Sequence, residues 1–445
     1  MKRTRALILS TCAMLAISLF AGCGNGKADS NGEGNSSGDG NKQVKLTFFN
    51  TSAEVNNQFE ELFEVYHKVN PDVTIELIPT PIGGQQIEKF QSLIASKNPP
   101  TISNLDPGHI YIYKDMFLDL ESEKAWFEEE AQPGSIESAL LDGKFLGIPY
   151  TVQGYGLQYN KRALEEAIGG TFDPSTIKTQ DDLEELFKKI EASGKAPVLI
   201  HGANWSVGAH FLGLNYALQS TDVEENRKFV QALKDGEVDL SSNAVFNGLL
   251  DTFDILKEYN IREKDPLVAD FAKDAQDFAT GEVPFFFMGD WLWSTIGNLE
   301  GIDDEYGFIP VPISNNEEDY GNTQVVVTQP KLLAIDNSGS TPEQQKAAME
   351  FIKWMLTSDE GHNALVSEMG FNVPYKSVEV ESTNVPSKAI AQYISEGKTI
   401  DLAIFNYLPA DYWVKTGDSM LKYLAGKIDR QELTKEVEDY WKSVK

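Results

Sequence analysis

The segment 281–296, GEVPFFFMGDWLWSTI, holds residue types that could form a binding site. Its phenylalanine run predicts a strand buried on both faces. Gly289 and Asp290 then disfavour a strand, and aspartate is rarely buried. Trp291 is therefore either a core residue or a flat apolar surface at the mouth of a site. Trp293 is expected to be structural and to lead into a short helix.

Residues for catalysis or metal binding form no recognisable motif. The five histidines are scattered, and no two are four residues apart on a predicted helix: His67, His109, His201, His210 and His362. An HExxH pair, a cysteine cluster, a phosphate-binding loop and an EF-hand loop are all missing. A pair of carboxylates spaced for glycoside hydrolysis stays open among the 68 acids. We predict no catalytic residue, no metal site and no cofactor.

The charge balance narrows the class of partner. The chain has 38 Lys and Arg against 68 Asp and Glu, a formal net charge of -30. Such a field repels phosphates and anionic head groups, so we expect no nucleic acid partner. A length of 445 residues with 41% hydrophobic content predicts two lobes or domains.

The first 23 residues have the layout of an export signal. Three basic residues precede an apolar stretch at 6–20, which is too short to span a membrane. The small residues that end at Cys23 resemble a bacterial lipobox, in which the cysteine is acylated. The alternative is an ordinary secretion signal with a chance cysteine. We predict a signal peptide at 1–22 and lipidation of Cys23, which anchors the chain to the membrane.

Residues 23–42 are predicted to form a flexible tether. This segment is rich in Gly, Ser, Asn and Asp, with almost no apolar residue. It contains the letters of a hydrolase nucleophile elbow at 34–38, but no predicted strand precedes them and no helix follows. No later segment approaches the roughly 18 apolar residues of a membrane span.

From residue 44 onward, predicted strands alternate with predicted helices. Strand patterns at 44–50, 73–79 and 99–105 are separated by amphipathic helices at 52–70 and 85–96. Such alternation predicts an α/β fold with a parallel, doubly wound layer. Ligands of these sheets bind beyond the carboxyl ends of the strands, where Asn50 and Asp106 fall. A second block follows residues 145–164, with Thr179 as the expected N-cap of a helix.

Several segments together resemble one protein family. Residues 142–167, DGKFLGIPYTVQGYGLQYNKRALEEA, resemble the G-K-x-Y-G-x-P … Y-N-K signature of extracellular solute-binding proteins. These proteins are the capture subunits of ABC importers, here of the carbohydrate-binding, maltodextrin-binding-protein-like type (family 1). GEVPFFFMGDWLWSTI resembles the family's G-x-W-x-W segment, and residues 347–361 resemble its late helix. The resemblance runs from about residue 44 to the C-terminus.

The resemblance implies a two-lobed, periplasmic-binding-protein-like fold. A cleft would lie between two α/β lobes that are joined by crossing hinge segments. We expect residues 43–152 plus 328–356 to form the N-terminal lobe, and 153–327 plus 357–445 the C-terminal lobe. Closure of the lobes over a ligand would be the signal that the importer reads.

The resemblance also implies a set of ligand contacts. Aromatic rings would cover the C–H faces of a sugar, while amides and carboxylates would bond its hydroxyls. The implied residues are Asn50, Asp106, Gln153, Trp205, Asp290, Trp291, Tyr412 and Trp413. Structural alternatives stay open for four of them: Asp106 as the cap of a turn, Asn50 as an Asx turn, and Trp205 and Trp413 as packing residues.

We therefore expect a lipid-anchored component of an ABC importer on the extracellular face of the membrane. It would capture an oligosaccharide by cleft closure, deliver it to the permease subunits, act as a monomer and have no enzymatic activity. The alternative is a secreted hydrolase or lyase that acts on polysaccharides, and a third possibility is an adhesin.

Overall fold

The computed structural model describes residues 43–80, 86–132, 135–136, 139–141, 143–297, 299–300, 302, 305–409 and 411–444. The predicted signal peptide (1–22), the lipidation site at Cys23 and the tether (23–42) lie outside these residues. Within the described ranges, no helix combines the length and the apolar composition that crossing a membrane requires.

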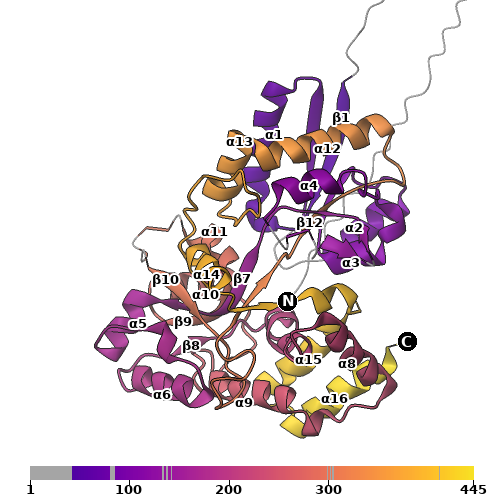
Figure 1. Cartoon of the computed structure of the whole chain (residues 1–445). Helices are drawn as coiled ribbons and strands as arrows, with labels where there is room; N and C mark the ends of the chain where they lie inside the picture. The colour runs from indigo at the N-terminus through magenta and orange to yellow at the C-terminus, as the bar shows by residue number, and fades with distance from the viewer. Residues whose placement is uncertain are drawn as a thin grey trace, which may run out of the picture. The chain divides into compact units, whose positions relative to one another are not determined.

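The first sheet has five strands within the described chain, in the order β2-β1-β3-β12-β6. Figure 1 labels β1 and β12 of this sheet. β1 (Val44–Asn50) runs parallel to β2 (Val73–Pro79) on one side and to β3 (Ile102–Leu105) on the other. The helices α1 (Asn56–Val69) and α2 (Gln86–Ala95) make the crossovers. The predicted parallel layer is therefore confirmed. It continues antiparallel through β12 (Leu332–Ile335) and β6 (Ile148–Pro149).

The second sheet is built around β7 (Gln153–Asn160). One edge of β7 pairs antiparallel with β9 (Phe285–Gly289), which in turn pairs parallel with β8 (Val198–Leu199). Two strands share the other edge of β7. β10 (Tyr306–Ile309) pairs with the second half of β7, and β11 (Val325–Thr328) pairs with the first residues of β7. β13 (Thr399–Asp401) adds parallel to β11.

Strand β9 is buried on both faces, as its phenylalanine run predicts. Phe285 and Phe287 lie in the largest hydrophobic cluster, with residues of α6 (Gln180–Glu191) and α9 (Ala244–Glu258). Phe286 and Met288 point to the opposite face and pack with residues of α10 (Phe271–Ala279) and α11 (Trp293–Ile296). Alternation along this strand therefore fixes helices to both faces of the second sheet.

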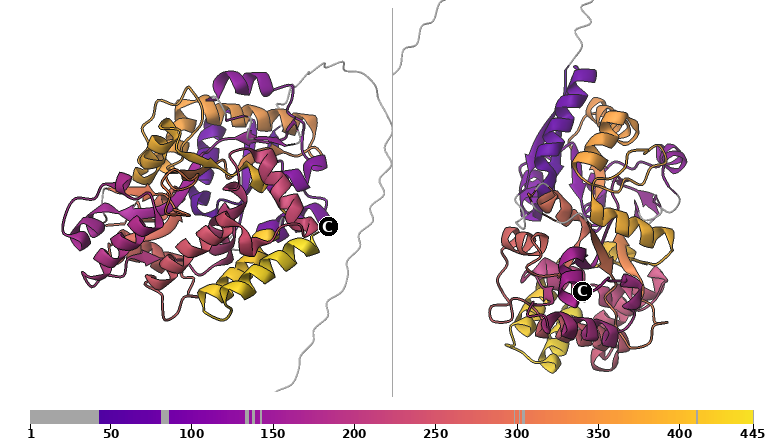
Figure 2. Two further views of the ribbon diagram at one scale, coloured as in Figure 1. Left: turned by 60° about the horizontal axis from the view of Figure 1, so that its bottom comes forward. Right: turned by 90° about the vertical axis from the view of Figure 1, so that its left-hand side faces the viewer.

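The remaining helices cover the two sheets. In both views of Figure 2 the orange helix α12 (Pro342–Thr357) lies beside the indigo elements of the first sheet, and residues of α12 contact β1. α16 (Arg430–Ser443) packs against both α15 (Tyr412–Leu424) and α8 (Val223–Asp235). The other α-helices of the described residues are α3 (Pro107–Ile112), α4 (Lys124–Glu130), α5 (Lys161–Ile168), α7 (Leu214–Ala217), α13 (Asp359–His362) and α14 (Val385–Ser395). Two short strands, β4 (Leu140–Leu141) and β5 (Lys144–Phe145), pair antiparallel with each other.

The chain returns to the second sheet later than the predicted boundary at residue 357. Leu365, Phe371 and Tyr375 are buried in the hydrophobic cluster of the first sheet, and Val380 still packs against it. Ile390 of α14 packs instead with residues of β10 and β11. The prediction ended the lobe with the helix, but the apolar side chains after α12 continue to cover the first sheet. The chain therefore passes from the first sheet back to the second sheet between Val380 and α14.

Thr179 is the N-cap of α6, as predicted. Its hydroxyl accepts a hydrogen bond from the Asp182 N–H at 3.1 Å, and the Asp182 carboxylate accepts one from the Thr179 N–H at 3.0 Å. Thr179→Ala leaves one helix N–H unpaired and should lower the free energy of unfolding by about 1 kcal/mol. Urea denaturation measures this change. Thr280→Ala is the control, since its exposed hydroxyl only bonds back to its own helix; equal losses in both variants would contradict the prediction.

Candidate functional site

Trp291 lies at the end of the second sheet, directly after β9. The chain turns at Gly289 into the short helix η7 (Asp290–Leu292), and the indole folds back over the Gly289 backbone. A Cβ atom on Gly289 would lie 2.0 Å from the indole ring, so only glycine leaves room for it. Trp291 is half-buried and packs against two hydrophobic clusters of this lobe.

Three further rings join Trp291 in an aromatic cluster, which we define as Tyr155, Trp205, His210 and Trp291. The His210 ring centroid lies 5.1 Å from that of Trp291, 5.4 Å from that of Trp205 and 4.7 Å from that of Tyr155. Trp205 and His210 come from the helix η5 (Trp205–Leu212), whereas Tyr155 comes from β7. Trp205, His210 and Trp291 are half-buried, so this cluster is part of the protein surface.

A buried ion pair lies behind Trp205. The His201 ring packs against the Trp205 ring, with a centroid distance of 5.0 Å. The His201 Nδ1 atom forms a hydrogen bond with the Asp274 carboxylate at 2.8 Å. Arg262 bonds the other oxygen of Asp274 at 2.7 Å. This network fixes the ring that supports Trp205, so His201 is a positioning residue.

Two glycines bring η5 against α15, the helix that carries Trp413. A Cβ atom on Gly208 would lie 2.4 Å from the Trp413 carbonyl oxygen, and one on Gly417 would lie 2.9 Å from the Asn204 carbonyl oxygen. Trp413 is half-buried. Tyr412, by contrast, is 6% exposed and packs in the core against Phe405 and Tyr216. Of the two predicted ligand contacts Tyr412 and Trp413, only Trp413 is exposed enough to contact a ligand.

A charged group faces outward at the end of the first sheet. Asp106 follows β3, and its two carboxylate oxygens lie 2.9 Å from the Lys331 Nζ atom and 3.2 Å from the His109 Nδ1 atom. Its side chain is still 44% exposed. Burial raises the pKa of Asp106, but Lys331 and His109 together hold it well below its usual range. Asp106 is therefore an oriented carboxylate with free acceptor capacity.

The ends of the two sheets lie close together within the described part of the chain. Burial dominates the pKa of both His210 and Tyr412, which belong to the second sheet, and the charge of the Asp106 carboxylate also acts on each of them. The Tyr111 ring of α3 lies 5.8 Å from the Tyr407 ring of η9 (Ala403–Tyr407). The aromatic cluster of one lobe thus approaches the charged group of the other.

Asn50 has no hydrogen-bonding capacity left for a ligand. It is fully buried, and its amide nitrogen donates to the Ser52 carbonyl at 2.8 Å and to Asn56 at 2.9 Å. Its amide oxygen accepts from the Ser52 N–H and from Asn104. The structural alternative, an Asx turn at the end of the strand, describes this residue. Gln153 is half-buried at the start of β7, and its amide forms no hydrogen bond to the described residues.

Asp290 joins crossing segments of the chain and does not reach the surface. It is 1% exposed, so its predicted hydroxyl contacts are inconsistent with its position. One carboxylate oxygen accepts from the Gly154 N–H at 3.3 Å, and the other accepts from Ser387 at 2.8 Å and Asn372 at 3.4 Å. Burial raises the pKa of Asp290 to about 7. This residue connects β7, the returning chain and α14.

The sequence interpretation missed several residues of the site. Tyr155 lies two residues after the predicted Gln153, and His210 lies five residues after the predicted Trp205. Their closeness in sequence to predicted site residues was the signal that could have identified them. Lys331 reaches Asp106 only because β12 lies beside β3, whereas His109 follows Asp106 by three residues and contacts it locally. Glu54, half-buried after β1, also belongs here: burial raises its pKa, while the charge of Lys331 lowers it.

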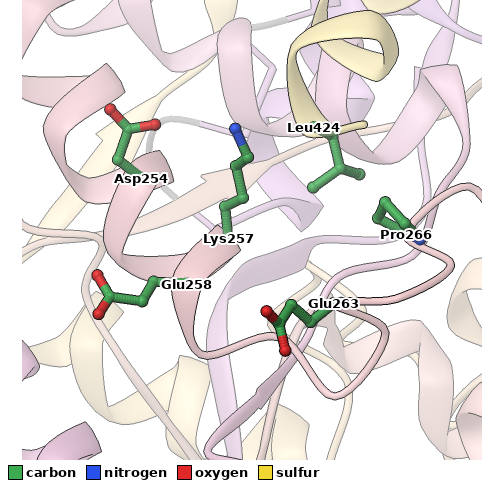
Figure 3. Close-up of a pocket in the computed structure, with 6 residues that line it drawn as sticks. All are labelled: Asp254, Lys257, Glu258, Glu263, Pro266 and Leu424. Atoms are coloured by element: carbon green, nitrogen blue, oxygen red, sulfur yellow. The ribbon is translucent and has the colours of Figure 1, made fainter. Parts of the chain in front are cut away.

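A separate hollow of about 270 Å³ lies on the second lobe (Figure 3). It is lined by Asp254, Lys257, Glu258, Glu263, Pro266 and Leu424. The Asp254 carboxylate already accepts a hydrogen bond from Tyr423 at 2.6 Å, and Lys257 lies 4.6 Å from the Tyr423 ring centroid. None of the predicted site residues lines the hollow. Among the described residues, no group of His, Cys, Asp and Glu is arranged to hold a metal ion.

Two α/β lobes with aromatic and charged side chains at their facing ends define a ligand-binding protein. The model of the bacterial extracellular solute-binding protein family matches residues 61–394, and the chain belongs to this family. The members are binding proteins of ABC transporters and not enzymes, which confirms the prediction of no enzymatic activity and excludes the hydrolase or lyase alternative.

Known proteins agree with this assignment. An uncharacterised ABC transporter extracellular-binding protein from Pyrococcus horikoshii is 23% identical over 324 residues, which cover 70% of each chain. The structure of the solute-binding protein RafE in complex with raffinose matches with a TM-score of 0.74 at 19% identity, and covers 90% of this chain and 99% of that one. A chitin oligosaccharide binding protein matches with a TM-score of 0.72 at 19% identity, with coverages of 90% and 98%. The predicted two-lobed fold is confirmed.

Proposed function

We propose that this protein captures an oligosaccharide between its two lobes and delivers it to the permease subunits of an ABC importer. The observation that carries the proposal is the approach of the aromatic cluster to Asp106. Aromatic rings stack on the apolar faces of sugar rings, and an oriented carboxylate accepts hydrogen bonds from hydroxyl groups. The two tryptophans of the aromatic cluster, Trp205 and Trp291, favour a ligand of two or more sugar units.

The ligands of structurally similar proteins support the choice of substrate class. Three such proteins have structures with raffinose, stachyose or maltose bound, and another is a chitin oligosaccharide binding protein. All of these ligands are neutral sugars with several hydroxyl groups. A neutral ligand also suits a chain with a formal net charge of -30, which would repel an anion.

We further propose that the protein acts as a monomer held at the outer face of the membrane through an acylated Cys23. The tether at 23–42 would then let the folded body reach the permease. Replacing Cys23 with alanine should release the protein from membranes into the medium. Retention of the variant in the membrane fraction would contradict the anchor and leave the binding proposal untouched.

Titration calorimetry with a panel of neutral oligosaccharides tests the binding proposal. We expect at least one of raffinose, stachyose, maltotriose, chitotriose and xylotriose to bind with a stoichiometry of one and without release of smaller sugars. Disaccharides are expected to bind more weakly than their longer homologues. A folded protein that binds no member of the panel would refute the proposal.

A further inference from the structure

His210 is the one histidine whose ring nitrogens have no hydrogen-bond partner in the part of the chain that the structure describes. The other four are engaged: His67 with the Val73 carbonyl, His109 with Asp106, His201 with Asp274 and His362 with the Leu356 carbonyl. His210 is half-buried, and its nitrogens, which have no partner among the described residues, are not among the fully buried polar atoms, so a ligand can reach them. A polar group in this position suggests a ligand that completes it.

The surroundings of His210 fix its orientation. Its ring stacks on Tyr155 with an interplanar angle of 28° and a centroid distance of 4.7 Å. The Tyr155 hydroxyl donates to the carbonyl oxygen of His210 itself at 3.2 Å, which ties the two residues together. Trp205 and Trp291 contact the same imidazole at interplanar angles of 73° and 55°. The ring is therefore held in place before any ligand arrives.

The imidazole is neutral at physiological pH. Burial lowers the pKa of His210 to about 4, and the Asp106 carboxylate opposes this shift without reversing it. A neutral imidazole has one N–H donor and one nitrogen acceptor. It can therefore donate to one sugar hydroxyl and accept from another, which neither tryptophan can do.

We infer that His210 determines the specificity of this site, by hydrogen-bonding hydroxyl groups of a sugar that stacks on Trp205 or Trp291. The inference rests on the proposed function, because it assigns a role within the same binding site. Tryptophan faces bind most pyranose rings alike, since stacking does not depend on hydroxyl position. A hydrogen-bonding group that the bound sugar covers does discriminate, because a sugar that lacks the partner hydroxyl leaves the covered group unsatisfied.

The experiment compares the wild-type protein with His210→Phe and His210→Gln. Phenylalanine keeps the stack on Tyr155 but removes both nitrogens, whereas glutamine keeps a donor and an acceptor. We expect His210→Phe to weaken binding of the tightest panel sugar about tenfold and to reduce the ratio of affinities across the panel. His210→Gln should recover part of both losses. His67→Gln is the matched control, expected to bind like the wild type, since His67 bonds a carbonyl of the first lobe.

Two results separate the inference from the proposed function. If the wild type binds no panel sugar, both fail together. If the wild type binds but His210→Phe has the same affinities, the inference alone is overturned. Nitrogen NMR of histidine-labelled wild-type protein decides the case without any variant. The tightest panel sugar should shift the His210 ring resonances and not those of His67, and unmoved His210 resonances would also overturn the inference.

Discussion

Replacing Gly289 with alanine is expected to weaken oligosaccharide binding at least tenfold while the protein stays folded. The backbone at Gly289 is extended, with φ of -114°, so alanine introduces no strain. The new methyl group would instead occupy the space of the Trp291 indole, 2.0 Å from its nearest ring atom. The ring has to rotate away, and its stacking on the ligand, of the order of 1 kcal/mol beyond the area that it buries, is lost.

Calorimetry with the tightest panel sugar measures this effect. Trp291→Ala removes the ring outright and should lose affinity by a similar factor. Gly170→Ala is the matched control, because a Cβ atom there meets nothing within 4 Å. Thermal denaturation confirms that each variant is folded. Unchanged affinity in both Gly289→Ala and Trp291→Ala would show that the indole does not contact the ligand.

Replacing Asp290 with asparagine is expected to remove a pH dependence from the stability of the protein. Burial raises the pKa of Asp290 from 3.8 to about 7, so the folded state binds this proton more tightly than the unfolded state does. The stabilising effect of the proton is complete below the unfolded pKa of 3.8 and is lost as the pH rises through about 7. A pKa difference of one corresponds to about 1.4 kcal/mol, so the total loss of stability is of the order of 4 kcal/mol.

Asparagine imitates the protonated carboxyl at this position. Its oxygen can still accept from the Gly154 N–H, and its amide nitrogen can donate to the Ser387 hydroxyl. Urea denaturation at pH 4 to 8 should therefore show Asp290→Asn gaining stability relative to the wild type with rising pH. Asp239→Asn, at the exposed N-cap of a short helix, is the control and should follow the wild type. Parallel curves for Asp290→Asn and the wild type would contradict the prediction.

Local pattern predicted the secondary structure better than the site. The phenylalanine alternation of β9 and the capping box at Thr179 depend on neighbouring residues, and both were correct. The strand pattern places Asp106 at a strand end, the resemblance implies Trp205 and Trp291 as ligand contacts, and the structure leaves part of each exposed. The sequence alone could not tell which of two neighbouring side chains is exposed. Asp290 and Trp291 are adjacent, yet only the Trp291 indole reaches the surface.

The position at which the chain leaves the first sheet is hard to predict for a related physical reason. A helix end at residue 357 looks like the end of a lobe, but the decision depends on which sheet the next apolar residues cover. Leu365 and Phe371 cover the first sheet, and nothing in their local spacing says so. Likewise, Lys331 meets Asp106 only because β12 is inserted beside β3.

The position of β12 between β3 and β6 also governs the order in which the protein can fold during its synthesis. β3 ends at Leu105, yet the strand that covers its open edge begins only at Leu332. At about 5 to 20 residues per second, the ribosome needs roughly 10 to 45 s to add the intervening chain. During that time β3, whose four residues are all buried in the finished protein, presents an unpaired edge. The N-terminal lobe is therefore the first to be started, but it gains this strand only after the chain from β7 to β11 of the second lobe has been made.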